Sequence, residues 1–196
     1  TIYGGPGAVF DVGGSVNLNQ GTLNLHSSDT NLLTANIGGN LVITNSSRLY
    51  LFAGPTNGVS PITGLVVNVY GELTISNSSW VYPVGEPNSG AAPCLHVNRL
   101  NLQGGATSGF DASRRGFGGQ KGPGVGGWAP GGWWGGAGYG GAGGAANYGG
   151  AGSTYGIADA PVLPGSGGYI GRPGGGLIWI YVDDVARLDG TLKADG

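Results

Sequence analysis

Apolar and polar residues alternate over short runs along most of this chain. The runs are rich in Leu, Val and Ile, and each ends at Gly, Asn, Ser or Pro. Such alternation indicates β-strands with one buried face, whereas Gly and Pro interrupt every window that could keep the spacing of an amphipathic helix. The pattern therefore predicts an all-β chain with strands near 16–18, 23–25, 41–43, 49–51, 65–69, 73–75 and 95–97.

The strand pattern repeats along the chain at one constant offset. This offset joins Leu41 to Leu73, Ile43 to Ile75, Gly39 to Gly71, Asn45 to Asn77, Pro55 to Pro87 and Gly58 to Gly90, and a weaker copy begins at Gly14, a shorter distance ahead of Gly39. Short strands and polar turns at such a period are typical of a parallel β-helix, in which equivalent residues stack on successive rungs. We therefore predict a parallel β-helix (β-solenoid). An antiparallel sandwich is less favoured because it does not require equivalent residues at this spacing.

The chain is also predicted to contain a long insertion. Between residues 116 and 176 nearly half of the positions are Gly, at spacings too irregular for collagen. Glycine lets backbone segments approach closely and proline presets φ, so we expect polyproline-II-like segments or loops joined by backbone hydrogen bonds. Further along, Val185–Leu188 echoes Val97–Leu100. The predicted organisation is β-helix coils over 1–113, a Gly- and aromatic-rich insertion packed on the solenoid over 114–176, and a returning coil over 177–196.

The large aromatic side chains leave two roles open. They can anchor the insertion on the solenoid, or they can be exposed as flat surfaces for sugar rings or for another protein. The candidate ligand-binding residues are Trp80, Tyr82, Trp128, Trp133, Trp134 and Tyr139.

Asn45 and Asn77 each begin an Asn-Ser-Ser sequence. The repeat places both at one corner of the predicted solenoid, where stacked asparagine side chains can pair their amides. The same tripeptide is the acceptor pattern for N-glycosylation. We favour the stacked corner, and the sequence leaves glycosylation at the two positions open.

Charge and composition narrow the range of functions. Eight Lys and Arg against ten Asp and Glu give a net charge of −2 without a basic face, which argues against nucleic acid. The longest apolar run, 177–182, has the length of a strand and not of a membrane-spanning helix. We expect no cofactor and no metal site. His26 and His96 lack the spacing of a zinc motif, and the acidic turns could hold Ca²⁺ but form no recognisable loop motif.

Enzymatic activity is not expected. A β-helix hydrolase needs two carboxylates that face each other across a sugar, and a lyase needs a base beside a cation. Asp183 and Asp184 form the one adjacent acidic pair, and neighbours on a strand point to opposite faces.

The later half of the chain resembles a known class of protein. Pro164–Gly168, Gly174–Ile180 and Leu188–Gly196 follow the pattern PGSGG, then GGG with an apolar strand, then DGT-x-x-A-x-G. This is similar to the glycine-rich parallel β-helix modules of very large secreted or surface proteins. The resemblance implies an extracellular protein of structural or adhesive type, and it carries no catalytic residues.

Together these features predict a non-enzymatic structural or adhesive protein, located outside the cell or at its surface. Terminal rungs without caps would pair head to tail with another copy into a filament, or continue into a longer chain of a surface fibre. One alternative is a carbohydrate- or receptor-binding module that uses exposed aromatic residues on a polysaccharide or protein partner. The other is a fragment of a β-helix polysaccharide lyase or hydrolase.

Overall fold

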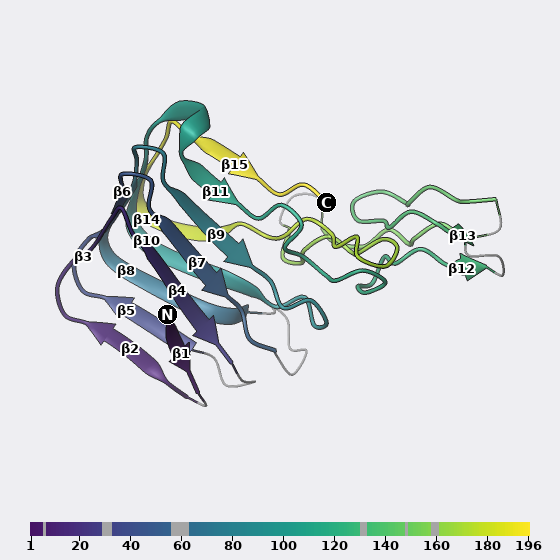
Figure 1. The fold of residues 1–196 in the computed structure, drawn as a ribbon, viewed down its shortest axis with the longest axis horizontal. Helices are drawn as coiled ribbons and strands as arrows, with labels where there is room; N and C mark the ends of the chain where they lie inside the picture. Colours follow the sequence, from purple (N-terminus) through teal and green to yellow (C-terminus); the bar gives the residue numbers. More distant parts are fainter. Residues whose placement is uncertain (6, 29–32, 56–62, 130–132, 148, 158–160) are drawn as a thin grey trace.

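The computed structural model describes residues 1–5, 7–28, 33–55, 63–129, 133–147, 149–157 and 161–196. It confirms the predicted fold class, because parallel strands wind into a β-solenoid. A lobe that contains the glycine-rich segment projects from one side of the solenoid (Figure 1).

Two parallel sheets form the walls of the solenoid. The first contains, in spatial order, β1 (Ile2–Gly4), β4 (Thr22–Ser27), β7 (Arg48–Phe52), β9 (Trp80–Val84), β11 (Gly109–Asp111) and β15 (Thr191–Lys193). The second contains β14 (Trp179–Leu188), β10 (Ala92–Leu102), β8 (Thr63–Ile75), β5 (Leu33–Ile37) and β2 (Val9–Val12), with β3 (Val16–Asn19) paired to β6 (Leu41–Thr44) and β6 to β8. The long strands β8, β10 and β14 bend around a corner of the solenoid (Figure 1). A short 3-10 helix, η1 (Gly105–Thr107), lies between β10 and β11.

The strand register confirms the sequence repeat. Leu73 of β8 pairs with Leu41 of β6, and Ile75 pairs with Ile43, so the constant offset of the sequence is the stacking of one rung on the next. Val16 of β3 pairs with Leu41, at the same shorter separation as Gly14 from Gly39. Gly58, one member of the predicted repeat, lies outside the described residues.

The register expected from the later echo is wrong. The echo sets Leu100 opposite Leu188, whereas the structure pairs Leu102 with Leu188 and Leu100 with Ala186. From Arg99 onward the two registers differ by two residues, a shift that leaves each of these side chains on its original face of the sheet. The apolar pattern alone therefore cannot distinguish the two registers.

The core runs through the interior of the solenoid because alternate residues of each strand point inward. In β5, for example, Leu33, Ala35 and Ile37 are buried, while Thr34 and Asn36 are half-buried on the outer face. Burial of these apolar columns is the main favourable contribution to folding. The core comprises Leu25, Leu33, Ala35, Ile37, Leu41, Ile43, Leu49, Leu51, Leu65, Val67, Val69, Leu73, Ile75, Val81, Leu95, Val97, Leu100, Leu102 and Phe110.

The lobe leaves the solenoid after β11 and returns at β14. The connection between β9 and β10 spans residues 85–91 only. The base of the lobe is tied down by its backbone: the Gly118 N–H donates to the Pro87 carbonyl, 2.8 Å away, and the Gly176 N–H donates to that of Ala112, also 2.8 Å away. Phe117 is buried there, and a Cβ added at Gly90 would overlap its ring. Phe117 therefore anchors the lobe on the β9–β10 loop.

Inside the lobe, most backbone hydrogen bonds join segments that are neither helix nor strand. The described exception is a short antiparallel pair, β12 (Trp128–Ala129) and β13 (Trp133–Trp134). Gly152 is hydrogen-bonded to two other segments of the lobe. Its N–H donates to the Gly136 carbonyl, and its own carbonyl accepts from the Gly143 N–H, both at 2.9 Å. A polyproline-II form for these segments and the boundaries at 113/114 and 176/177 stay predictions.

Candidate functional site

The corner of β10 is one residue shorter than the corners of the strands beside it. Val97–Arg99 of β10 pairs with Val69–Glu72 of β8 and with Val182–Val185 of β14. One residue of β10, Asn98, therefore lies where each neighbouring strand has two. Register irregularities of this kind are frequent beside functional sites. Here a hollow lies on each side of the short corner.

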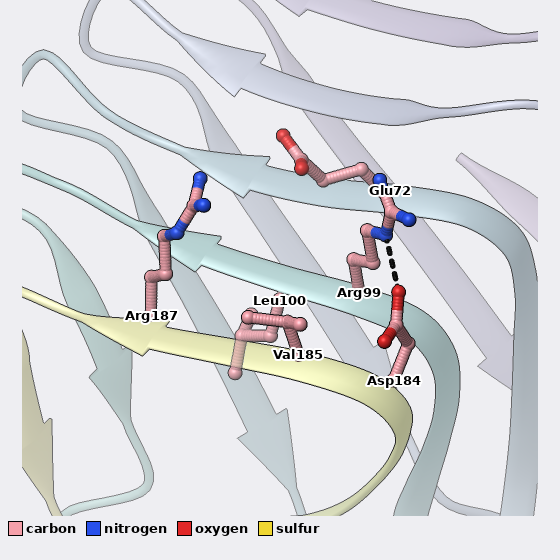
Figure 2. Close-up of a pocket in the computed structure, with 6 residues that line it drawn as sticks. All are labelled: Glu72, Arg99, Leu100, Asp184, Val185 and Arg187. Atoms are coloured by element: carbon pink, nitrogen blue, oxygen red, sulfur yellow. Dashed lines mark hydrogen bonds and ion pairs between the residues drawn. The ribbon is translucent and has the colours of Figure 1, made fainter.

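The first hollow has a volume of about 320 Å³, at the lower end of the range for small-molecule sites. Figure 2 shows two carboxylates and two guanidinium groups on three adjacent strands, around two apolar side chains. The lining residues are Glu72, Arg99, Leu100, Asp184, Val185 and Arg187.

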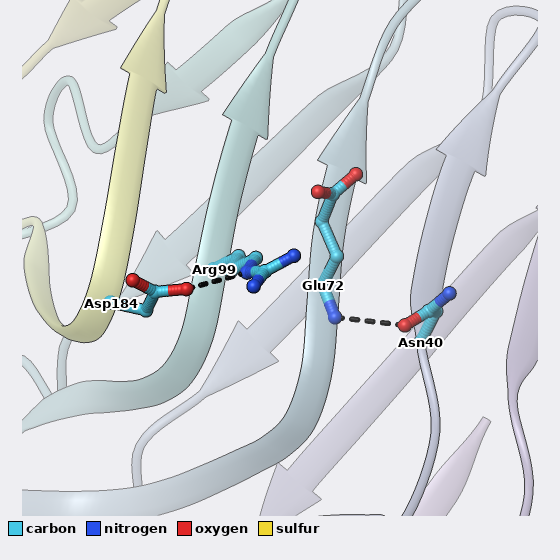
Figure 3. Close-up of polar contacts among 4 residues, drawn as sticks. All are labelled: Asn40, Glu72, Arg99 and Asp184. Atoms are coloured by element: carbon cyan, nitrogen blue, oxygen red, sulfur yellow. Dashed lines mark hydrogen bonds and ion pairs between the residues drawn. The ribbon is translucent and has the colours of Figure 1, made fainter.

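Arg99 and Asp184 form the ion pair of this hollow. The Arg99 Nε donates to the Asp184 Oδ2 at 2.7 Å (Figures 2 and 3). The two side chains are 56% and 46% exposed, so water screens the pair and its contribution to stability is at most about 1 kcal/mol. The pair fixes the orientation of the guanidinium group more than it stabilises the fold.

Glu72 is held from three directions. Its Oε1 accepts from the Thr74 Oγ1 at 2.9 Å and from the Asn101 Nδ2 at 3.2 Å. Its backbone N–H donates to the Asn40 Oδ1 at 2.9 Å (Figure 3). On the preceding rung the Asn40 N–H donates to the Ser15 Oγ in the same way, at 2.9 Å. Within the described part of the chain, the Glu72 Oε2 receives no donor.

Arg187 completes the first hollow from β14. Among the described residues it makes neither an ion pair nor a side-chain hydrogen bond. Its guanidinium group therefore offers all of its donors to solvent or to a ligand.

The second hollow, of about 380 Å³, lies on the other side of the β10 corner. Tyr70 is 64% exposed there, and the ring of His96 lies 4.7 Å from that of Tyr181. Asp183 lines this hollow and Asp184 lines the first, so the adjacent carboxylates serve different hollows. The lining residues are Asn68, Val69, Tyr70, His96, Asn98 and Asp183.

Trp80 and Tyr82, two predicted ligand-binding residues, lie on the outer face of β9. The Tyr82 ring stacks on Tyr50 of β7, with centroids 4.5 Å apart, and the Arg115 guanidinium lies 4.8 Å from the centroid on the β11 side. Both faces of Tyr82 are therefore occupied by the protein. The Trp80 ring has the Lys193 ammonium 5.1 Å from its centroid. These contacts give Tyr82 a structural role and leave it no face for a sugar.

A second aromatic column runs through Tyr3, His26 and Phe52 on the same sheet. The ring centroids are 4.6 Å apart for Tyr3 and His26 and 4.0 Å apart for His26 and Phe52. Burial lowers the pKa of His26, and the Thr1 ammonium lowers it further, because both disfavour the charged imidazolium.

We expect this column to make stability depend on pH. Since the pKa of His26 is lower in the folded chain than the value of about 6.5 in the unfolded chain, protonation favours unfolding. The free energy of unfolding should therefore fall as the pH is lowered from about 7 to about 5, and His26→Phe should remove most of this slope. Urea unfolding at several pH values measures it. A slope unchanged by His26→Phe would assign the dependence to another group.

The lobe holds the other predicted aromatic residues in different environments. Trp128 is 60% exposed, and it pairs across the β12–β13 ladder with Trp134, whose ring lies 6.0 Å from that of Tyr169. Tyr139 is half-buried and meets Tyr155 edge to face at 4.9 Å. The backbone of Trp133 lies in β13, and its side chain is outside the described part of the structure. The structure thus brings Trp128 and Trp134 together, away from Trp80 and Tyr82 on the solenoid.

Asn45 and Asn77 lie one above the other at a corner, in left-handed backbone conformation (φ 56° and 52°). The Asn77 Nδ2 donates to the Asn45 Oδ1 at 3.3 Å, and the Asn45 Nδ2 donates to the Asn19 Oδ1 at 3.0 Å. A similar ladder joins Asp11, Asn36 and Asn68 on another face. The amides satisfy one another across rungs, which supports the stacked corner.

No protein-family model, curated protein or solved structure matches this chain. The fold itself defines a parallel β-solenoid with a glycine-rich lobe. Within the described ranges, no helix has the length and apolar character needed to cross a bilayer. Sequence reasoning missed Glu72, Arg99 and Arg187 of the first hollow, because nothing in the local sequence marks the short corner of β10.

Proposed function

We propose that this chain is a non-enzymatic structural or adhesive protein, acting outside the cell or at its surface, whose copies join end to end or which forms part of a larger surface fibre. The observation that supports the proposal is the unpaired outer edge of the last rung. This rung is formed by β14 and β15, and we call it the terminal rung. Among the described strands, none pairs with the outer edge of β14 or β15.

Inward-facing apolar residues of the terminal rung are more exposed than their partners on the preceding rung. Leu188 is 59% exposed, whereas its partner Leu102 on the preceding rung is fully buried. Leu192 is 52% exposed, whereas its partner Phe110 is fully buried. An apolar hollow of about 230 Å³ opens at this end, lined by Leu100, Ile178, Ile180, Val182, Ala186, Leu188 and Leu192.

The opposite end of the solenoid also leaves apolar residues of its edge strands partly uncovered. Phe10 of β2 and both Val16 and Leu18 of β3 are only half-buried, and these strands also form an edge. In a parallel solenoid the two ends have the same strand direction, so a second copy placed head to tail continues both sheets. Such a contact does not close on itself and produces a filament.

Charging the terminal rung should prevent this association. Leu188→Lys places an ammonium group in the end contact, and lysine at a strand edge is a common natural block to edge pairing. Sedimentation velocity at increasing concentration should show growing assemblies for the unchanged chain and a monomer for Leu188→Lys. Ile170→Lys, a similarly exposed apolar position in the lobe, is the matched control and should still assemble. Assembly that survives Leu188→Lys would contradict end-to-end joining through this rung.

A second candidate function is binding of carbohydrate or a receptor through the lobe, favoured by the exposure of Trp128. An exposed indole suits a contact that is partly apolar and partly hydrated. Quenching of tryptophan emission by a polysaccharide, and its loss in Trp128→Ala, would support this role. Unchanged quenching in Trp128→Ala would show that Trp128 of the lobe does not bind the polysaccharide.

A further inference from the structure

The two hollows beside the β10 corner are lined by consecutive residues of β10 and of β14, and we call them together the groove. Asn98 lines one hollow and Arg99 the other, and Asp183 and Asp184 divide in the same way. Each pair is consecutive in sequence, so a ligand that fills both hollows would cross the short corner of β10 between β8 and β14. The combined space exceeds that of a single small hollow and suits an elongated molecule.

The groove is lined mainly by side-chain groups. The backbones of β8, β10 and β14 pair with one another on both sides of the short corner. An extended peptide binds by strand addition along a free strand edge, and across the groove β8 pairs with β10 and β10 with β14, so the free edge lies only on the outer side of β14. Recognition across the groove therefore comes mainly from guanidinium, carboxylate, amide and ring groups.

We propose that this groove binds a neutral oligosaccharide, held by Arg187 and Glu72 in one hollow and stacked on Tyr70 in the other. A sugar hydroxyl both donates and accepts hydrogen bonds, so it suits a wall in which guanidinium donors alternate with carboxylate acceptors. The three carboxylates of the groove (Glu72, Asp183 and Asp184) outnumber its two guanidinium groups, which disfavours an acidic sugar or a nucleic acid.

Individual residues have distinct parts in this site. Arg187 supplies donors that no described residue uses, and the Glu72 Oε2 supplies an acceptor beside an oxygen already held by Thr74 and Asn101. The ion pair with Asp184 fixes the orientation of the Arg99 guanidinium group in the same hollow. Tyr70 has no stacked aromatic neighbour among the described residues, so its ring face is open to the apolar side of a sugar ring.

Calorimetric titration of the 196-residue chain with cellohexaose, mannohexaose and the acidic hexagalacturonate tests the proposal. We expect binding of at least one of the neutral hexasaccharides and weaker binding of hexagalacturonate. Tyr70→Ala and Arg187→Ala should each weaken the neutral ligand about tenfold, since each removes a contact worth one to two hydrogen bonds. Both side chains are exposed, so both variants should keep the fold, which circular dichroism checks.

Ile170→Ala is the matched control, because it shortens an exposed side chain of the lobe that has no part in the groove, and it should bind as the unchanged chain does. Absence of heat with all three ligands at millimolar concentration would overturn the proposal. Binding that is lost in Trp128→Ala and kept in Tyr70→Ala and Arg187→Ala would overturn it too, by moving the site to the lobe. The inference does not rest on end-to-end association, so Leu188→Lys should bind the ligand normally.

Discussion

Replacing Gly152 with Ala is expected to open the glycine-rich lobe at a cost of about 3 kcal/mol, the upper end of typical overpacking. A Cβ at this position would overlap the Gly124 carbonyl oxygen and press on the Gly138 nitrogen and the Gly136 oxygen. All three obstacles are backbone atoms on other segments, so no side-chain rotation can relieve the overlap. The lobe must separate its segments to admit the methyl group.

Gly144→Ala is the matched control for this prediction. It lies in the same lobe, its φ is not in the left-handed range, and a Cβ there meets no atom within 4 Å. Hydrogen exchange followed by mass spectrometry should show faster exchange across the lobe in Gly152→Ala and unchanged exchange in Gly144→Ala. Equal exchange in the two variants would contradict the view that glycine serves close packing here.

Phe110→Ala is expected to destabilise the solenoid by about 4 kcal/mol. Phe110 is fully buried and is among the largest such side chains of the core. Its backbone pairs with Val81 on one rung and with Leu192 on the next, so the cavity would lie between the terminal rung and the rest of the fold. The loss combines the removed apolar contact with the cavity left behind.

Thermal unfolding measures this effect, with a fall in melting temperature of about 10 °C expected for a chain of this size. Tyr70→Ala is the control because this aromatic residue is largely exposed, and its melting temperature should stay within about 2 °C of the unchanged chain. A small shift for Phe110→Ala would mean that the core near the terminal rung is loosely packed.

Much of the solenoid could be predicted because equivalent positions on successive rungs carry the same types of residue. Leu41 and Leu73 occupy the same inward column, and Asn45 and Asn77 the same corner, so the sequence records the register directly. The register of β14 is harder to predict from the sequence. The register that aligns the echo and the observed one differ by two residues from Arg99 onward, and both place the same side chains inward. The echo of Val97–Leu100 therefore predicted the rung but gave the wrong partner for Leu188.

The groove could not be predicted because it depends on β10 having one corner residue fewer than β8 and β14. Nothing in the local sequence shows that Asn98 alone replaces two residues of its neighbours, and the effect appears only once β8, β10 and β14 lie side by side. The roles of the aromatic residues were hidden for a similar reason. Only the register places Tyr50 on one face of Tyr82 and Arg115 on the other, and only the lobe's docking gives Phe117 its anchoring role.

Negative-stain electron microscopy of the unchanged chain at increasing concentration tests the central proposal most directly. End-to-end joining predicts unbranched filaments of constant width, which lengthen with concentration and whose axial repeat is a whole number of rungs spaced about 4.8 Å apart. Leu188→Lys at the same concentrations should give separate particles. Separate particles of the unchanged chain at every concentration would contradict the proposal.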